Sequence, residues 1–558
     1  MKKRWALAAD ADASDVQELH RALGADFGAL ARVLAQRGLT SLAAIKEWLP
    51  GTPLDTVDLY QMADLEKAAV RLATARSNGE RIFLFGDYDV DGTTAVSVGK
   101  MALERGGWTV STYIPDRYAE GYGLSKVGID RALAEGASLL VALDCGIKSV
   151  DLIAYAQGQG LEVIVADHHM PGPELPPAVA VLDPKRSDCA FPHKEICGCG
   201  VGYLLWRTAY REAGLDPNEL DDLLDLVAVS IGADMVPLIG LNRYWVRQGL
   251  AAINTSPRPS LAALLREKTP GVITLQDVVF AIAPKINAAG RMRHGHLAVD
   301  LLTHPDPEAL AQLGQNIEAY NSERRATEKE VSLAAQAQAA TQHSHVGLVL
   351  VGQDWHKGVL GIVAQRTVEA FYKPTIVLTE HEGKLSGSAR SVPGLDLYEA
   401  LDEASEHLIQ FGGHRAAAGM TLLPEKLEAF REAFNHAVDR RWPESQRQPT
   451  QHIDSIAQVH ELHEGLATLL DRLEPFGMDN EAPIWGLKGV LLQEVRTMSE
   501  GKHLRATAVD ATTGAKLPVI GFHWGHADVS QPVDLAIVLE WNNFRNSKTL
   551  QARILDLQ

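Results

Sequence analysis

Three carboxylates stand close together after an apolar run in the stretch "RIFLFGDYDVDGTTA", residues 81–95. The run is typical of a buried strand, and Asp87, Asp89 and Asp91 follow it at alternate positions. Carboxylates packed side by side repel one another, so one of them must take up a proton unless a cation lies between them. The spacing therefore predicts a divalent-metal site. The simpler alternative is a helix N-cap formed by one aspartate and a neighbouring threonine.

Further acidic and histidine positions stand where other apolar runs end. "LLVAL" leads into Asp144, "VIVA" leads into Asp167, His168 and His169, and Asp234 closes the run "DLVAVSIGAD". In an open parallel sheet, ligands bind beyond the carboxyl ends of the strands. Carboxylates with one or two imidazoles suit Mn²⁺ or Mg²⁺. Together the motifs predict a centre for two ions about 3.5–4 Å apart, a common arrangement for phosphoryl hydrolysis.

The elements that must position these residues follow from the pattern of apolar runs. From about residue 80, short apolar runs alternate with amphipathic stretches, which predicts an α/β fold with a parallel sheet and crossover helices. Residues 310–342 contain no proline and a single glycine, and we expect them to form a long helix that joins two domains. A second α/β pattern begins at "VGLVLVG", and short β-like runs near the C-terminus predict a small β-barrel.

Composition and charge exclude several classes of protein. The chain has 558 residues, of which 46% are apolar and 22% charged, as expected for a globular protein of several domains. Its formal net charge of −18 argues against a protein that passively coats DNA, but not against a metal-dependent nuclease. No apolar run is long enough to span a membrane, and the N-terminal stretch "MKKRWALAADADASD" does not resemble a signal peptide. We therefore expect a cytoplasmic protein without a membrane partner.

The four cysteines do not form a disulfide framework in so long a chain. Cys189, Cys197 and Cys199 do cluster around His193, but without the C-x2-C spacing of common zinc sites. Reduced, half-buried thiols are therefore favoured over a zinc site.

The quoted motifs resemble those of the RecJ family of DHH phosphoesterases, in order and in spacing. "FLFGDYDVDGTTA", "ALDCGI", "VIVADHH" and "AVSIGADMVPL" resemble the four metal-binding motifs of that family. The resemblance continues through "INAAGRM", "NSERRATE", "WHKGVLGIVAQR", "SGSARSVPGLDL" and "FGGHRAAAGM". Near the C-terminus, "LEPFGMDNEAPIW" resembles the start of the family's OB-fold domain. The similarity covers roughly residues 75 to 558.

The resemblance implies a fold and a domain order. The expected fold is a parallel-sheet DHH domain joined by a long helix to a smaller α/β DHHA1 domain, followed by an OB-fold β-barrel. The corresponding segments are an N-terminal helical lead-in at 1–75, the DHH catalytic domain at 76–305, the linking helix at 306–345, the DHHA1 nucleic-acid-binding domain at 346–445 and the OB-fold at 451–558.

The implied activity is metal-dependent 5′-to-3′ hydrolysis of single-stranded DNA to mononucleotides in DNA repair and recombination, with two Mn²⁺ or Mg²⁺ ions per site. A single-strand-binding protein and a helicase are the implied partners of a monomeric enzyme. Two alternatives share parts of the pattern. One is a DHH-family phosphoesterase of small substrates, which would usually lack the C-terminal β module. The other is a non-catalytic scaffold that binds single strands, which would have lost metal ligands.

The resemblance also implies roles for individual residues. One ion would be held by Asp89, Asp144, His168 and Asp234, and the second mainly by Asp87 and Asp144. His169 would lie near the scissile phosphate as a donor or proton-transfer group. Asp91 would hydrogen-bond the turn or begin the next helix, with ligation as the alternative, and Asp167 would orient a ligand. The expected DNA-binding residues are Arg117, Arg291, Ser388, Arg390, Gly412, Gly413 and His414. One departure from the family pattern is Lys285, which stands where arginine is more usual.

Overall fold

The computed structural model describes residues 3–266, 271–544 and 547–558, and the chain folds into two compact units. The first, here called the parallel-sheet unit, consists of Pro50–Arg324 and a short second segment, Pro475–Glu481. The second, here called the barrel unit, consists of the chain up to Leu49, Arg325–Glu474 and the chain from Ala482 onward.

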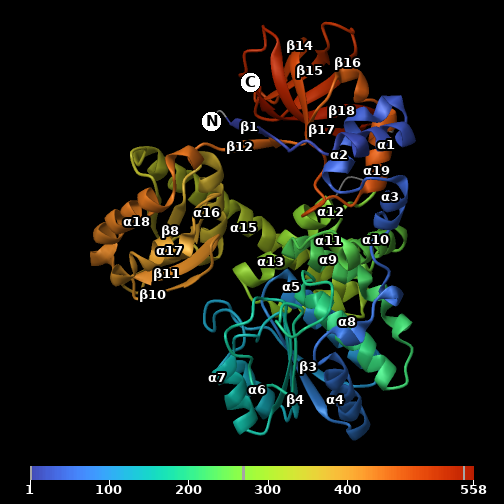
Figure 1. The fold of residues 1–558 in the computed structure, drawn as a ribbon. Helices are drawn as coiled ribbons and strands as arrows, with labels where there is room; N and C mark the ends of the chain where they lie inside the picture. The colour runs from blue at the N-terminus through green and yellow to red at the C-terminus, as the bar shows by residue number, and fades with distance from the viewer. Residues whose placement is uncertain (1–2, 267–270, 545–546) are drawn as a thin grey trace. The chain divides into compact units, whose positions relative to one another are not determined.

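A five-stranded parallel sheet forms the centre of the parallel-sheet unit (Figure 1), with strand order β3-β2-β4-β5-β6. Its strands are β2 (Arg81–Gly86), β3 (Thr109–Tyr113), β4 (Leu139–Leu143), β5 (Glu162–Ala166) and β6 (Ala180–Leu182). After β3 the chain crosses over β2 to form β4, so the strand order reverses between β2 and β4. The predicted α/β class and parallel sheet are confirmed, and the reversal marks the place where such sheets bind ligands.

Helices cover both faces of this sheet, and successive side chains of β2 point alternately into the two cores that result. Ile82 and Leu84 point into the larger core with the helices α4, α5 and α8, whereas Phe83 and Phe85 point into a core beneath α6 and α7. Every residue of β4 is buried, as expected for a central parallel strand. The helices are α4 (Leu65–Asn78), α5 (Val90–Arg105), α6 (Lys126–Ala134), α7 (Val150–Gly158), α8 (Gly198–Glu212), α9 (Leu224–Asp234), α10 (Gly240–Thr255), α11 (Pro259–Leu264), α12 (Leu275–Asp277), α13 (Ala283–Met292) and α14 (His296–Thr303).

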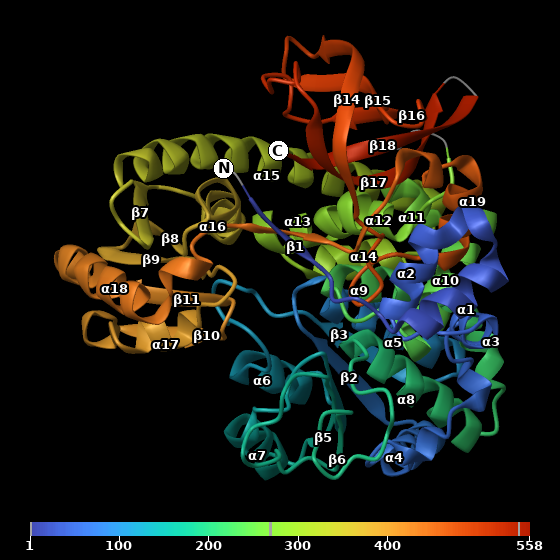
Figure 2. The same ribbon diagram turned by 45° about the horizontal axis from the view of Figure 1, so that its top comes forward.

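The barrel unit contains a second sheet, of mixed direction and order β10-β11-β9-β8-β7. Helix α18 (Leu427–Arg441) packs on one face through Phe430 and Phe434, and α16 (Lys357–Phe371) packs on the other through Val359 and Val363 (Figure 2). The strands are β7 (Leu348–Gln353), β8 (Thr375–His381), β9 (Lys384–Arg390), β10 (Gln410–Gly413) and β11 (Ala417–Leu422), with α17 (Leu397–Asp402) after β9.

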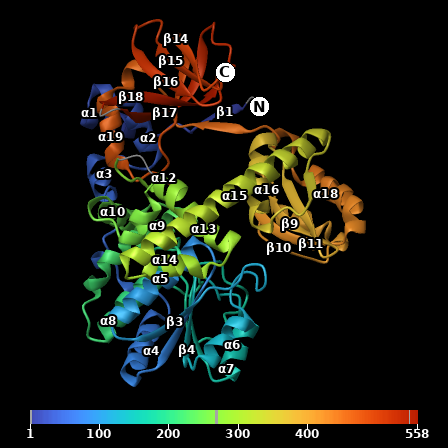
Figure 3. The same cartoon turned by 180° about the vertical axis from the view of Figure 1, so that it is seen from behind.

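A closed β-barrel follows, as predicted, because β14 pairs with both β15 and β17. Its strands are β14 (Trp485–Met498), β15 (His503–Val509), β16 (Lys516–Gly521), β17 (Val533–Phe544) and β18 (Ser547–Leu557), with β13 (Ser455–Ile456) beside β14. The helix α19 (Glu464–Leu473) precedes β14, and Figure 3 shows it beside the N-terminal helices. There the ring of Phe27 meets the ring of His463 edge to face.

The N-terminal segment contains one strand in addition to its helices. β1 (Arg4–Leu7) pairs in parallel with β12 (Thr450–Ile453), ahead of α1 (Ala13–Leu23), α2 (Gly28–Gln36) and α3 (Leu42–Trp48). The predicted long helix is α15 (Pro307–Thr341). Its first part belongs to the parallel-sheet unit and its last part to the barrel unit. The expected border at residue 75 falls inside α4, and the five-segment division stays a prediction. Within the described ranges, no helix combines the length and apolarity needed to span a bilayer.

Candidate metal centre and nucleic-acid contacts

The register of the parallel sheet explains why the predicted acidic positions meet. The last residues of β2, β4 and β5 pair across the sheet, Gly86 with Leu143 and Leu143 with Ala166. The next residue of each strand is therefore an aspartate in the same row, namely Asp87, Asp144 and Asp167. This row lies at the carboxyl edge of the sheet, on either side of the reversal in strand order.

Three overlapping groups of side chains bring their ligand atoms within 4.8 Å of one another. Asp144 is common to two of these groups and His168 to two, so the groups form one continuous centre. A shared carboxylate between two groups is the arrangement that a pair of ions requires. The groups are Asp87 with Asp89 and Asp144; Asp144 with His168 and His169; and Asp91 with His168 and Asp234.

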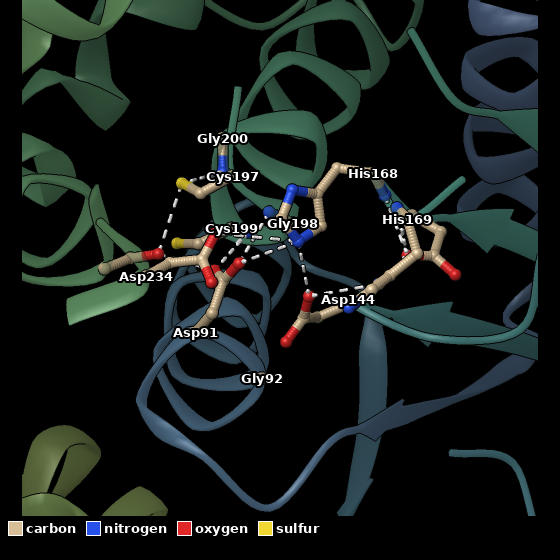
Figure 4. Close-up of polar contacts among 12 residues, drawn as sticks. Asp91, Gly92, Asp144, His168, His169, Cys197, Gly198, Cys199, Gly200 and Asp234 are labelled. Carbon is tan, nitrogen blue, oxygen red and sulfur yellow. Dashed lines mark hydrogen bonds and ion pairs between the residues drawn. The ribbon is translucent and has the colours of Figure 1, made fainter. Parts of the chain in front are cut away.

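His168 lies at the middle of this centre (Figure 4). Its Nε2 atom is 3.2 Å from Oδ1 of Asp144 and 3.7 Å from Oδ2 of both Asp91 and Asp234. The side chain is buried, yet neither ring nitrogen makes a hydrogen bond, and the same holds for Oδ1 of Asp87 and of Asp144. Buried polar atoms without partners are costly, and a divalent cation would satisfy them together. The donor set therefore fits Mn²⁺ or Mg²⁺.

The electrostatics of the centre also favour a bound cation. Burial, with the charge of Asp89, raises the pKa of Asp87 to about 8. Burial, with the charges of Asp91 and Asp89, raises the pKa of Asp234 to about 8. The pKa of Asp144 is raised well above its usual range by burial and by the surrounding carboxylates, whereas burial lowers the pKa of His168. A neutral imidazole is ready to bind metal, and a cation would stabilise the ionised carboxylates.

The position of Asp144 is set by its own backbone conformation and by a close approach to Gly198. Asp144 has a φ of 59°, in the left-handed region that few residues other than glycine adopt. A Cβ atom on Gly198, the first residue of α8, would lie 2.6 Å from Oδ1 of Asp144. Gly198 therefore leaves the space that the Asp144 carboxylate occupies. In the sequence, Gly198 stands between two cysteines, and nothing in that pattern indicates a contact with Asp144.

Asp91 lies closer to His168 than we expected. Its carboxylate accepts hydrogen bonds from the backbone N–H groups of Gly198 and Cys199, both 2.7 Å long (Figure 4). It also accepts a hydrogen bond from the Ser230 hydroxyl. These bonds direct the carboxylate toward His168 and Asp234. The sequence-based ligand set placed Asp89 in this position instead.

Asp89 has a different place in the structure. It is the N-cap of α5, and its Oδ1 accepts a hydrogen bond from the Gly92 amide. Its side chain is grouped with Asp87 and Asp144, on the side of the centre expected to hold the second ion. Asp89 can therefore both cap α5 and bind a metal ion, although the sequence analysis treated these roles as alternatives.

Asp167 orients the second histidine. It accepts hydrogen bonds from the backbone amides of Ile147, His168 and His169, and from Nδ1 of the His169 ring at 2.7 Å. Burial acts to raise the pKa of Asp167, but the bond to His169 lowers it overall. Burial acts to lower the pKa of His169, and the same bond raises it overall. Nε2 of His169 lies 3.0 Å from the hydroxyl of Tyr122, a residue that the sequence reasoning missed.

The four cysteines are buried and form no disulfide. Cys197 caps α8, because its sulfur accepts a hydrogen bond from the Gly200 amide, and it also lies 3.2 Å from the Ser230 hydroxyl. Among the described residues, none of the groups able to hold a metal includes a cysteine. The sequence analysis expected half-buried thiols, whereas all four cysteines are buried.

In the barrel unit, the predicted DNA-binding residues lie on β9 and β10, the strands on either side of β11, and in the turn after β10. Ser388 of β9 pairs with Gly419 of β11, which pairs with Gly412 of β10. Gly413 ends β10, and the amide of His414 donates to the Ala417 carbonyl in the turn that follows. Gly412, Gly413 and His414 are exposed, so a ligand can approach the backbone at this end of β10.

Arg390 is pre-positioned next to Ser388. Its Nη1 donates to the Ser388 hydroxyl at 2.9 Å and to the Ala389 carbonyl at 2.8 Å, and burial lowers its pKa. A Cβ atom on Gly361 of α16 would lie 2.8 Å from Nη2 of Arg390 and 3.2 Å from the Ser388 hydroxyl. Gly361 thus provides the space for this pair. Its position inside a helix, where glycine is unfavourable, was the signal available in the sequence.

The basic residues of the parallel-sheet unit differ in their surroundings. The guanidinium of Arg117 lies 4.0 Å from the centre of the Tyr88 ring, and its charge acts on Asp87 and Asp89. The backbone carbonyl of Arg291, on α13, accepts from the hydroxyl of Tyr118. Lys285 is buried and donates to the Leu264 carbonyl at 2.6 Å, so this departure from the family pattern has a structural role.

Three protein families match parts of this chain. The family "DHH family, N-terminal domain" matches residues 81–231, "DHHA1 domain" matches residues 343–440, and "RecJ OB domain" matches residues 453–556.

Curated relatives align along most of the chain. The single-stranded-DNA-specific exonuclease RecJ of Escherichia coli (strain K12) is 33% identical over 555 residues, covering 94% of each chain. The protein of the same name from Bacillus subtilis (strain 168) is 34% identical over 537 residues, covering 94% of this chain and 67% of that one.

A solved structure has the same fold. The crystal structure of RecJ in complex with Mn²⁺ from Thermus thermophilus superposes with a TM-score of 0.85 at 28% identity, covering 100% of this chain and 79% of that one. A second structure of that protein, in complex with Mg²⁺, gives a TM-score of 0.77.

Proposed function

Because this chain belongs to the RecJ family of single-stranded-DNA-specific exonucleases, we propose that it removes nucleotides from single-stranded DNA one at a time, starting at the 5′ end. The observation that carries this proposal is the row of Asp87, Asp144 and Asp167 at the sheet edge, with unsatisfied ligand atoms around His168. Phosphodiester hydrolysis needs such a concentration of negative ligands around divalent cations.

The proposed ligand set follows the geometry. Asp91, Asp144, His168 and Asp234 would hold one ion, and Asp87, Asp89 and Asp144 would hold the second. Two such ions, Mn²⁺ or Mg²⁺, supply Lewis-acid activation of water and neutralise charge on the scissile phosphate. The relatives with solved structures bind these same two metals.

The protein's own residues would orient the substrate and move protons. The bond between Asp167 and Nδ1 of His169 fixes the imidazole ring and favours its protonated form, as the raised pKa indicates. Nε2 of His169 would then donate a hydrogen bond to a non-bridging phosphate oxygen, in place of its contact with Tyr122. Arg117, Arg291 and the aromatic ring of Tyr88 would hold the neighbouring nucleotides.

The second set of contacts would select the end of the strand. Arg390 and Ser388 offer donors suited to a terminal 5′ phosphate, and the exposed residues Gly412, Gly413 and His414 would let it approach the backbone of β10 closely. Capture of that phosphate would explain a start at the 5′ end. We place these contacts in a DHHA1 domain at 346–445 and further single-strand contacts in the OB-fold at 451–558.

Two alternatives from the sequence receive less support. A phosphoesterase of small substrates does not account for the C-terminal match to "RecJ OB domain" over residues 453–556. A non-catalytic scaffold does not account for a complete set of ligands, since Asp87, Asp144, His168 and Asp234 are all present and gathered together.

The cellular context of this activity is also a proposal. Single-stranded DNA arises in repair and recombination, where a helicase unwinds the duplex and a single-strand-binding protein covers the product. We propose that the enzyme works with both, as a monomer in the cytoplasm.

The experiment that tests the proposal uses single-stranded DNA labelled at either end, with Mn²⁺, Mg²⁺ or a chelator. We expect the 5′ label to be released at once as mononucleotide, while the 3′-labelled strand shortens gradually, in both cases only with metal. Release of the 3′ label first would reverse the polarity. Binding without cleavage under any metal would identify a scaffold.

A further inference from the structure

The stretch "LEPFGMDNEAPIW" has no role in the proposed chemistry, although its position in the fold is unusual. Residues Pro475–Glu481 pack in the parallel-sheet unit, whereas the chain on both sides, α19 before and β14 after, belongs to the barrel unit. A short connecting segment is thus built into the unit that carries the metal centre.

The core of this segment is a tight turn, here called the 477–480 turn. Gly477 and Asn480 exchange two backbone hydrogen bonds of 3.0 Å, and Asp479 between them has a φ of 57°. The Asn480 side chain is buried and donates to the Pro475 carbonyl at 2.8 Å. These backbone and side-chain hydrogen bonds therefore fix the conformation of the turn.

One contact of the turn lies just after Asp234. The Leu238 amide donates to the Met478 carbonyl at 2.8 Å, and a Cβ atom on Gly477 would lie 2.7 Å from Cδ1 of Leu238. Leu238 is buried, four positions beyond the ligand. The turn therefore holds the loop that leaves α9.

A second contact lies just before Asp234. The same Cβ atom on Gly477 would lie 3.5 Å from Cδ2 of Leu275, and a Cβ atom on Gly232 would lie 2.8 Å from Cδ1 of Leu275. Leu275 therefore lies between the 477–480 turn and the C-terminal end of α9. The 477–480 turn braces the chain on both sides of Asp234.

Asp234 needs such support more than Asp144 and His168 do. It is the last residue of α9, and its side chain is 27% exposed, against 3% for Asp144 and 8% for His168. Met235, which follows, has a φ of 57° and is 60% exposed, so its own side chain does not hold this conformation. A non-glycine residue keeps such a conformation only where its surroundings impose it.

We propose that the 477–480 turn is a positioning element of the metal centre, which sets the divalent-ion affinity of the site that contains Asp234. This inference rests on the proposed function, because it assumes that Asp234 binds metal. A segment that connects two elements of the barrel unit would therefore control how tightly the parallel-sheet unit binds its ion.

The test compares Mn²⁺ binding, by calorimetric titration and by the electron paramagnetic resonance of free Mn²⁺, in four forms of the full chain. These are the native protein, Gly477→Val, the milder Asn480→Ala, and Gly158→Val as control. Gly158 ends α7, has no atom within 4 Å of the point where a Cβ atom would lie and has no left-handed φ, so the same substitution is tolerated there. We expect a Mn²⁺ dissociation constant at least fivefold higher in both turn variants and unchanged in the control. The cleavage rate at saturating Mn²⁺ should stay within twofold of native.

The path through Leu238 is tested by a double-mutant cycle. Leu238→Ala removes the atoms that a valine side chain at position 477 would meet, so Gly477→Val should add little to the effect of Leu238→Ala alone. Additive effects would overturn this path.

The other outcomes are equally decisive. A lower melting temperature with unchanged Mn²⁺ affinity in the turn variants would show that the turn only stabilises the fold. If Gly477→Val does not fold, the Mn²⁺ affinity of Asn480→Ala tests the proposal in its place. If the native protein itself binds no Mn²⁺, the proposed function fails, whereas native binding that the variants preserve contradicts the positioning role alone.

Discussion

Gly198 at the start of α8 and Asp144 at the end of β4 are in such close contact that a Cβ atom on Gly198 would lie 2.6 Å from Oδ1 of Asp144. Gly198→Ala removes no ligand, yet it must displace the carboxylate that both ions would share. We expect Mn²⁺ affinity to fall roughly tenfold or more, as for other changes around metal ligands. Overpacking should also destabilise the fold by about 1–3 kcal/mol. Calorimetric Mn²⁺ titration and thermal unfolding measure the two effects.

The control for this prediction is Gly158→Ala, at a site with space for a Cβ atom. Equal Mn²⁺ affinity in Gly198→Ala and the native chain would mean that Asp144 tolerates displacement, and hence that it does not bridge two ions.

The choice between Asp91 and Asp89 is tested by a matched pair of substitutions. Asparagine at position 89 retains an oxygen that can cap α5, and asparagine at position 91 retains one acceptor for the Gly198 and Cys199 amides. Because Asp91 faces His168 and Asp234, we expect Asp91→Asn to weaken Mn²⁺ binding without DNA roughly 10- to 100-fold. Asp89→Asn should weaken it less and reduce cleavage more.

The reverse order of Mn²⁺ affinities would restore the ligand set inferred from sequence. His168→Ala serves as the positive control, since it should abolish cleavage under either assignment while the chain still folds.

These two aspartates also mark where sequence reasoning reaches its limit. The strand ends could be predicted, because apolar runs followed by aspartate recur at β2, β4 and β5, and parallel strands present their carboxyl ends at one edge. Which of Asp87, Asp89 and Asp91 faces His168 could not be predicted. That depends on the turn into α5 and on the N-terminus of α8, which is more than a hundred residues away in the chain.

The same limit applies to elements whose partners are distant in the chain. β1 is four residues long, and its sequence "RWAL" has no marked period; it becomes a strand because β12 lies beside it. The 477–480 turn carries clear turn residues, but its packing against Leu238 and Leu275 could not be inferred from them. Long-range pairing decides such cases.

Metal removal should make stability depend on pH in a defined direction. In the metal-free protein the pKa values of Asp87 and Asp234 are about 8, against an ordinary value of 3.8 in the unfolded chain. Between these values the folded state holds protons that the unfolded state releases, so stability falls as pH rises from about 4 to about 8. One such group accounts for roughly 2 kcal/mol between pH 6 and pH 8.

Thermal unfolding of the chelator-treated enzyme at these two pH values checks this prediction. Addition of Mn²⁺ should raise the melting temperature more at pH 8 than at pH 6. Asp87→Asn, which cannot titrate, should reduce the slope of the metal-free protein. A metal-free melting temperature that rises toward pH 8 would show that the carboxylates are not forced together.

Recognition of the strand end can be separated from catalysis at Arg390. The guanidinium is held by Ser388 and the Ala389 carbonyl, and Gly361 leaves space beside it, so it is oriented before a ligand binds. A charge-assisted bond to a terminal phosphate contributes about 1.5–3 kcal/mol, so Arg390→Ala should weaken binding of 5′-phosphorylated DNA roughly 10- to 100-fold. Binding of 5′-hydroxyl DNA should change little, and Mn²⁺ affinity should not change at all. Arg440→Ala, which removes an exposed arginine paired with Glu403, is the control. Equal losses on both DNA ends would mean that Arg390 contacts the strand elsewhere, and the start at the 5′ end would then need another cause.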